Sequence, residues 1–211
     1  MNLTSKEYME YLVLAAKKID DNGNYITSLD AITGDGDHYT NMQLGFSKLT
    51  ENADEFALLS LSECFRKIGM TLMSAIGGSS GALYGSAYIS ASKVLMDKET
   101  IDTPLLLEIL STMLDAIKKR GDADVGMKTM IDALAPAVDV FRDGLTAGID
   151  SSSLFEAVKQ AADNGAQSTK DMEAVKGRAY YQANKGVGHI DPGAMTMAYQ
   201  IETLMDYISE L

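Results

Sequence analysis

The sequence has few of the residues that constrain a chain most strongly. Of its 211 residues, three are proline and one, Cys64, is cysteine, so no intramolecular disulfide can form. No apolar run approaches the roughly 20 residues needed to span a bilayer. The first residues also lack the charged and then apolar regions of a signal peptide. We therefore expect a cytoplasmic protein with no membrane segment.

Basic residues are scarce relative to acidic ones. The chain has 18 Lys and Arg against 30 Asp and Glu, which gives a formal net charge of −12. Binding to nucleic acid depends on a basic surface that displaces counterions, so this charge argues against a nucleic-acid partner. A protein this acidic holds an anionic phosphate only where cations or local basic groups neutralise the contact, and a bound ion is often the largest local charge.

Linkers, low-complexity runs, repeats and the alternating pattern of strands are also missing from the sequence. Its eighteen glycines cluster at discrete points, and its length suits one large domain or two small ones. Because nothing reads as a linker, we expect residues 1–211 to form a single domain.

Apolar residues at three-four spacing run along most of the chain and predict helices. The predicted segments are 4–22, 25–29, 40–49, 58–76, 79–95, 104–119, 129–145, 151–170 and 194–210. Thr4 with Glu7 forms a plausible capping box, and the serines at 151–153 offer a cap. Short connections favour antiparallel neighbours. We therefore expect an all-α bundle or closed barrel of about eight antiparallel amphipathic helices, with glycine-bearing loops near residues 34, 78, 121 and 188 at one end.

The stretch from Asp30 to Asn41 gathers carboxylates, glycines, a histidine and an amide. Asp30, Asp35 and Asp37 repel one another unless a cation lies among them, and magnesium suits oxygen ligands shared with water and phosphates. Gly-Asp-Gly-Asp is also an ordinary turn sequence. A calcium EF-hand is excluded because Thr40 and Phe46 would stand where its glycine and glutamate belong, and the sequence contains no phosphate-loop fingerprint.

Three further stretches have both a structural and a functional interpretation. Gly77–Gly81 joins two predicted helices and is either a pair of caps or an anion site at a helix start. Arg178 is either a solvated surface residue or a fork for phosphate. Gly188–Ala194 contains Asp191 and Pro192, which suit the start of a helix and equally a turn folded over a ligand. His189 is as readily a structural histidine as a ligand.

Taken together, the motifs resemble the nucleotide-binding subunit of dihydroxyacetone kinases. They are Asp30-x4-Asp-Gly-Asp-His-x-x-Asn41, Gly77-Gly-Ser-Ser-Gly81, Gly126-x-Lys-Thr-Met-x-Asp-Ala-Leu134, Gly177-Arg-Ala179 and Gly188-His-x-Asp-Pro-Gly-Ala194. The motifs occur in the family's order and together span nearly the whole chain. The sequence departs from the family pattern at Tyr39, Ala82 and Met127, where glycine, proline and aspartate are common.

The resemblance implies a barrel of eight antiparallel helices that binds ADP or ATP through two magnesium ions. It assigns the metal ligands to Asp30, Asp35 and Asp37, and a catalytic role at the terminal phosphate to Arg178. The resemblance also implies a set of nucleotide contacts at His38, Thr40, Asn41, Ser79, Ser80, Gly121, Met130, Arg178, Asp191, Pro192 and Gly193.

The resemblance also implies partners. Because no dihydroxyacetone-binding domain accompanies the motifs, we expect that substrate on a partner subunit. A phosphohistidine carrier of the phosphotransferase system is expected to rephosphorylate the bound ADP, which then acts as a coenzyme. A homodimer in the absence of these partners is left open. The alternatives are a related kinase with another acceptor and a regulatory module that senses nucleotide without catalysis.

Overall fold

The computed structural model describes residues 2–211 as an all-helical protein. These residues form ten α-helices and two short 3-10 helices, and the only β-type pairing among them is an isolated bridge between Leu3 and Ile101. The expected all-α class is confirmed. About eight helices were expected and ten are present. Helix α4 (Ala53–Ala57), which no predicted segment covers, is too short to show a periodic apolar face. No helix within residues 2–211 is long and apolar enough to cross a membrane.

The chain divides into two compact units, which are described separately. The first comprises residues 2–17 and 41–122, and the second comprises residues 18–40 and 123–211. Two helices, α1 (Ser5–Asp21) and α3 (His38–Glu51), contribute residues to both units.

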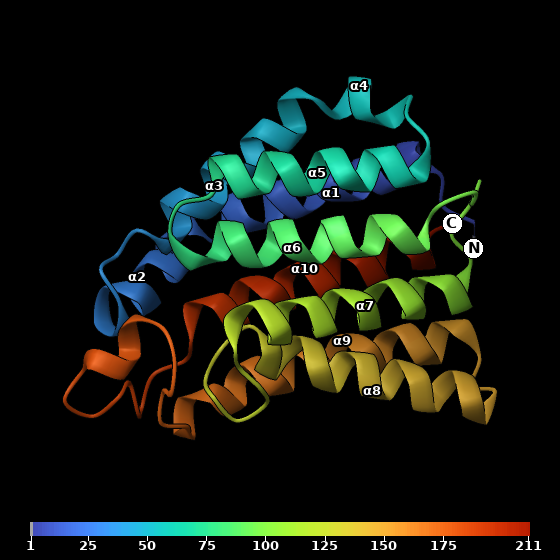
Figure 1. The fold of residues 1–211 in the computed structure, drawn as a ribbon. Coiled ribbons are helices and arrows are strands. Elements are labelled where there is room, and N and C mark those ends of the chain that lie inside the picture. Colours follow the sequence, from blue (N-terminus) through green and yellow to red (C-terminus); the bar gives the residue numbers. More distant parts are fainter. Residues whose placement is uncertain (1) are drawn as a thin grey trace. The chain divides into compact units, whose positions relative to one another are not determined.

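The first unit is built around three consecutive helices, α5 (Leu61–Ala75), α6 (Gly78–Val94) and α7 (Thr103–Gly121). Each of them runs antiparallel to the next (Figure 1). Tyr8 of α1 fills the centre, with its ring 4.3 Å from that of Phe65 and 6.4 Å from that of Tyr88. All three rings are buried, so an aromatic cluster forms the core of this unit.

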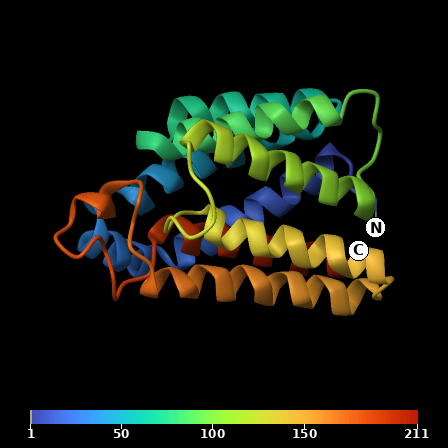
Figure 2. The ribbon, with the colours of Figure 1, turned by 60° about the horizontal axis from the view of Figure 1, so that its bottom comes forward.

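The second unit contains the other long helices, α2 (Gly23–Thr33), α8 (Ile131–Ala147), α9 (Ser151–Ser168) and α10 (Pro192–Ser209). Helix α9 runs antiparallel to both α8 and α10, against which it packs (Figure 2). Two 3-10 helices, η1 (Thr169–Asp171) and η2 (Arg178–Tyr181), lie in the segment between α9 and α10. That segment and the α2–α3 turn supply most of the candidate site.

Aspartate side chains begin three of the long helices. Asp102, Asp150 and Asp191 each accept a hydrogen bond from the backbone N–H three residues later, at 2.9, 3.0 and 2.7 Å. Such caps satisfy amides that have no partner inside the helix. The expected capping by the serines at 151–153 is therefore wrong, because Asp150 caps α9 and the serines form its first turn. The expected pair at the start of α1 is present, where Glu7 accepts from the Thr4 N–H at 2.8 Å.

The acidic stretch begins inside a helix. Helix α2 extends to Thr33, four residues beyond the predicted segment, so Asp30 lies in its last turn and not in a loop. Helix α3 starts at His38, two residues earlier than predicted. The turn between these helices is therefore only four residues long, which holds Asp35 and Asp37 close to Asp30.

Candidate functional site

Three carboxylates meet at the turn between α2 and α3. One oxygen from each of Asp30, Asp35 and Asp37 lies within 4.8 Å of the others. Asp30 is buried, and Asp35 and Asp37 are exposed. Hard oxygen ligands in this number suit a magnesium ion that completes its shell with water and phosphate oxygens. The three residues predicted from the sequence to hold metal are thus brought together, and their chemistry fits that ion.

Two glycines shape this turn. The N–H of Gly34 donates to the carbonyl of Asp30 at 2.6 Å, and a Cβ at Gly34 would collide with the Asp30 carboxylate. Gly36 has a φ of +79°, a conformation that favours glycine. The glycines of the Asp30-x4-Asp-Gly-Asp37 motif therefore allow the tight turn that brings the three carboxylates together.

His38 is fixed by hydrogen bonds at its backbone and at its ring. Its backbone N–H donates to Asp30 Oδ2 at 2.9 Å, and its Nε2 lies 3.0 Å from Thr196 Oγ1 on α10. The hydroxyl of Thr196 lies 3.1 Å from the carbonyl of Gly193, and when it donates there it accepts from His38, with the ring proton on Nε2. Burial lowers the pKa of His38, although Asp30 and Asp37 oppose that shift. In that tautomer the ring offers Nδ1 as an acceptor.

Arg178 reaches the carboxylate cluster from η2. Its Nη2 lies 2.6 Å from Asp35 Oδ2, and the two side chains are 66% and 39% exposed. An arginine held beside metal ligands can also grip phosphate oxygens, because its guanidinium stays charged and offers paired donors. The arginine predicted from the sequence is thus brought to the predicted metal ligands.

The start of α10 brings together the other predicted residues of this unit. Asp191 caps the helix through Ala194, Pro192 is its first residue, and a Cβ at Gly193 would lie 4.0 Å from the Met130 backbone nitrogen. The Met130 side chain is buried. Burial raises the pKa of Asp191 to about 7, against the lowering effects of its hydrogen bond and of Lys128.

Thr40 and the predicted residues of the first unit occupy helix ends. Thr40 is exposed in the first turn of α3. Ser79 and Ser80 lie in the first turn of α6, where backbone N–H groups lack partners in the helix.

Two further predicted residues complete the first unit's set. The Oδ1 of Asn41 would lie 2.5 Å from a Cβ at Gly77, so that glycine makes room for the amide. Gly121 ends α7. Contact of Thr40, Asn41, Ser79, Ser80 and Gly121 with a nucleotide stays a prediction.

Sequence reasoning missed three polar residues that organise the site. Lys128 is a buried lysine and Thr169 a buried threonine, and Thr196 holds His38. Lys128 belongs to a motif quoted above, but the motif gives no sign that its side chain is buried. Asp132, also in that motif, accepts from the N–H groups of Gly126 and Thr129 at 2.5 and 2.7 Å and shapes the turn around Lys128.

Comparison with known proteins assigns the family. The DAK2 domain matches residues 32–206, which include most of the residues described above. The chain belongs to the DAK2 domain family. The family resemblance stated from the sequence is therefore confirmed, and family members include kinase subunits.

Two curated relatives match this DAK2 chain along nearly its full length. The ADP-binding subunit DhaL of a PTS-dependent dihydroxyacetone kinase from Lactococcus lactis is 39% identical over 98% of this chain and 100% of its own. The ADP-binding subunit DhaL of a PEP-dependent dihydroxyacetone kinase from Escherichia coli is 32% identical, with 97% of each chain covered.

A solved structure has the same fold. The dihydroxyacetone kinase of C. freundii, crystallised in complex with AMP-PNP and Mg2+, superposes with a TM-score of 0.74 at 28% identity over 94% of this chain. This DAK2 chain spans about a third of the length of that kinase, 33%.

Proposed function

We propose that this chain is the ADP-binding subunit of a multi-subunit dihydroxyacetone kinase. The observation that carries the proposal is the meeting of Asp30, Asp35 and Asp37 with Arg178 at one turn. That arrangement occurs in a chain that is 39% identical to a DhaL subunit over that subunit's full length. The phosphoryl group passes from a phosphohistidine carrier of the phosphotransferase system to the bound ADP. It then passes to dihydroxyacetone on a partner subunit.

The three aspartates hold the metal in this proposal. Their carboxylate oxygens are close enough to share cations, and we propose two magnesium ions. Magnesium held by these carboxylates would neutralise the charge that develops on the phosphate during transfer. The neighbouring complex with AMP-PNP and Mg2+ supports the choice of nucleotide and metal.

The other side chains bind and orient the nucleotide. Arg178 grips the terminal phosphate and stabilises charge on it, because a guanidinium fork matches phosphate oxygens. His38, with its Nε2 proton committed to Thr196, accepts a hydrogen bond through Nδ1, which suits a hydroxyl of the sugar better than a phosphate oxygen. The Asp191–Gly193 turn, beside Met130, lies over the base. Catalysis of this kind is mostly positioning and charge neutralisation.

Transfer of label tests the proposal. The purified chain is loaded with ADP and magnesium, and the carrier and dihydroxyacetone-binding subunits are added with 32P-labelled phosphoenolpyruvate and the general phosphotransferase proteins. Label should appear in dihydroxyacetone phosphate and should depend on all three subunits. Nucleotide binding without label transfer would contradict the kinase role and favour a sensing module. If the label were transferred only to another acceptor, the substrate would not be dihydroxyacetone.

The metal assignment has its own test. Asp37→Asn should weaken magnesium-dependent ADP binding at least a hundredfold, because the site loses one of its three anionic ligands. Asp37 is exposed, so its carboxylate is accessible to the ion. The control is Asp54→Asn, an exposed aspartate of α4 in the first unit, which should leave binding unchanged. Calorimetric titration of ADP with and without EDTA measures both, and full retention by Asp37→Asn would make the assignment wrong.

A further inference from the structure

Lys128 is the least expected side chain in the structure. It is 2% exposed and its φ is +61°, in the left-handed region. Lysines are almost never fully buried unless they are paired, because a buried charge is costly. The ammonium donates to two backbone carbonyls, those of Thr169 and His189. The charges of Asp191, Asp132 and Asp171 also favour its protonated form, although burial lowers its pKa overall.

The two carbonyls belong to opposite ends of one segment. Thr169 directly follows α9, and His189 precedes α10 by three residues. Two more hydrogen bonds join the same ends: Gly188 N–H donates to the Lys170 carbonyl at 2.8 Å, and Asp191 N–H donates to Thr169 Oγ1 at 2.9 Å. Lys128 is thus one of three cross-links at the base of segment 169–191.

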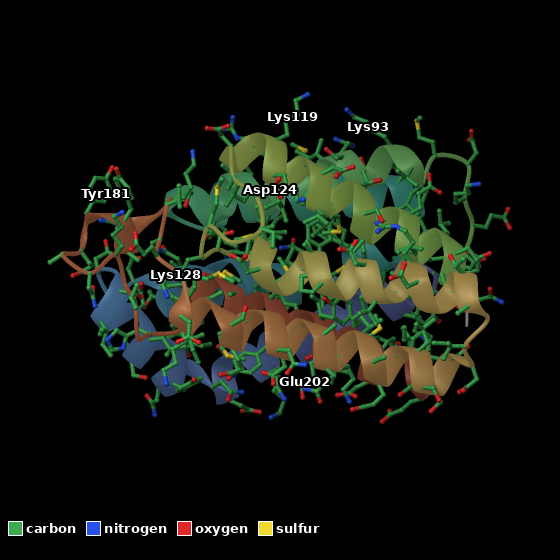
Figure 3. The ribbon with its side chains drawn as sticks, turned by 90° about the horizontal axis from the view of Figure 1, so that it is seen from below. Lys93, Lys119, Asp124, Lys128, Tyr181 and Glu202 are labelled. Atoms are coloured by element: carbon green, nitrogen blue, oxygen red, sulfur yellow. The ribbon has the colours of Figure 1, made fainter. Side chains whose placement is uncertain are left out.

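The outer part of the segment carries Arg178. It contacts the rest of the second unit through the exposed Arg178–Asp35 ion pair at 2.6 Å and through the Val175 N–H, which donates to the Met127 carbonyl at 3.3 Å. Tyr181 is 85% exposed, and Figure 3 shows it toward the outer end of the segment, with Lys128 nearer the helix ends. Lys185 pairs with Glu173 at 2.9 Å, but both belong to the segment itself. The position of Arg178 therefore depends on how the base is held as well as on its exposed pair with Asp35.

The packing around the Lys128 stem is tight as well. A Cβ at Gly186 would lie 2.9 Å from Lys128 Cε, and Gly186 has a φ of +72°. The segment's backbone thus lies directly on the lysine side chain. Replacing the ammonium would remove a donor from both carbonyls. The Thr169 carbonyl would keep the Met172 N–H at 3.2 Å, whereas the part-buried His189 carbonyl would lose the donor described here, and unpaired buried acceptors are costly.

We propose that Lys128 is a positioning residue whose ammonium pins both ends of segment 169–191 and so sets where Arg178 and Asp191 lie at the nucleotide site. The nucleotide part of this inference rests on the proposed function. The part that concerns how Lys128 holds the segment in place does not depend on the proposed function.

Limited proteolysis tests the pin without any nucleotide. Trypsin cleaves after Lys176, Arg178 and Lys185, and all three are in the segment. Lys128→Met keeps the length of the stem and removes the donors. We expect cleavage at these three sites to become at least tenfold faster, at a temperature where circular dichroism shows the helices intact.

The chain offers a matched control. Lys159 on α9 is 23% exposed and bonds Glu156 and Asp206 at 3.0 and 2.6 Å, so Lys159→Met also removes a partly buried ammonium from the second unit. It should leave cleavage within the segment unchanged. Unchanged cleavage in Lys128→Met, or equal acceleration in both variants, would overturn the proposal.

Rescue separates the charge from the packing. In a Cys64→Ala background, Lys128→Cys is aminoethylated while unfolded and then refolded, which restores an ammonium on a stem of lysine length. Protection from trypsin should return in the aminoethylated protein and stay absent in the unmodified one. Lack of protection after correct refolding would contradict the role of the ammonium.

The affinity for ADP tests whether the Lys128 hydrogen bonds affect the nucleotide site. With magnesium present, ADP should bind Lys128→Met about tenfold more weakly and Lys159→Met as well as the wild type. If the wild type binds no ADP, the proposed function is wrong. The proteolysis experiment still tests whether Lys128 holds the two ends of the segment together.

If Lys128→Met does not fold, amide hydrogen exchange of the wild-type protein tests the proposal instead. The Gly188 and Asp191 amides should then exchange at least tenfold more slowly than that of Tyr181, and equal exchange would overturn the proposal.

Discussion

At the scale of residues, the Asp35 carboxylate already has a cationic partner inside the acidic cluster. Its Oδ2 lies 2.6 Å from Arg178 Nη2, and one oxygen of the same carboxylate belongs to the group of three suited to a divalent ion. Binding of an ion through Oδ2 must displace the guanidinium or share the oxygen with it. In the proposed function the arginine then turns to a phosphate, so the same residue would balance the acidic turn and contact the ligand.

Arg178→Gln should therefore bind a divalent cation more tightly when no nucleotide is present. Exposed ion pairs contribute roughly 0.2–1 kcal/mol, so the gain should be at most about fivefold. The measurement is Mn2+ binding followed by electron paramagnetic resonance. Arg142→Gln removes an equally short exposed pair with Asp139 on α8 and should change nothing. Weaker Mn2+ binding by Arg178→Gln would contradict the competition.

Asp191 gives the second unit a pH-dependent stability. Its pKa of about 7 in the folded state exceeds the value of about 3.9 in unfolded chains, so the folded state binds the proton more tightly. This contribution to stability is complete below pH 4 and is lost as pH rises to 7. At about 1.4 kcal/mol for each pKa unit, the loss is at most about 4 kcal/mol.

Asp191→Asn should remove this dependence while it keeps a capping side chain. The variant and the wild type should have similar free energies of unfolding near pH 4.5, and the variant should be more stable at pH 8. Urea unfolding in EDTA at several pH values measures the difference. Asp150→Asn is the control, because a backbone hydrogen bond from Ser153 lowers the pKa of that exposed cap. A difference that does not grow with pH would contradict the assignment.

Side chains that act with sequence neighbours were predictable, and those that act across the fold were not. The three aspartates stand within eight positions, so their spacing alone indicated a common site. Thr196 holds His38 from 158 positions away, and no local pattern reveals that contact. Lys128 reads as a surface lysine because lysine is usually exposed.

At the scale of elements, two glycines let α5 and α6 approach closely. A Cβ at Gly69 would lie 2.9 Å from the Gly85 carbonyl oxygen and from Ile89, and one at Gly85 would lie 2.6 Å from the Met73 Cβ. These contacts are shorter than packing allows, and one of them is to backbone that cannot rotate away.

Gly69→Ala should lower the free energy of unfolding by about 1–3 kcal/mol, the usual effect of overpacking, despite alanine's better helix propensity. Ser74→Ala on the same helix removes an exposed hydroxyl and should stay within about 0.5 kcal/mol. Denaturant unfolding compares the two. A stabilised Gly69→Ala would show that the helices separate at little cost.

Helix type was predictable and helix ends were less so. The long helices followed from three-four spacing of apolar residues, which burial of one face requires. Helix α2 continues past its predicted end because Asp30-Ala-Ile-Thr33 carries no terminator, and its C-cap is Gly34. Helix α4 has five residues, fewer than two turns, so no periodicity marks it.

At the scale of the whole molecule, the chain passes between its two units at three points. Two of them lie inside helices, between Lys17 and Lys18 in α1 and between Thr40 and Asn41 in α3. Boundaries between independent domains usually fall in exposed linkers. No sequence pattern indicated this division, because a contact-based boundary inside a continuous helix leaves no change of composition.

Heating should therefore unfold the chain in one transition, because melting one unit alone would interrupt the continuous helices α1 and α3. ADP with magnesium at 100 times its dissociation constant should add about 2.7 kcal/mol. For a chain of this size that is an increase in Tm of about 5–10 °C. Differential scanning calorimetry measures both, with EDTA as the control that abolishes the shift. Two transitions, of which ligand moves only one, would show instead that the units unfold independently and that the single-domain expectation is wrong.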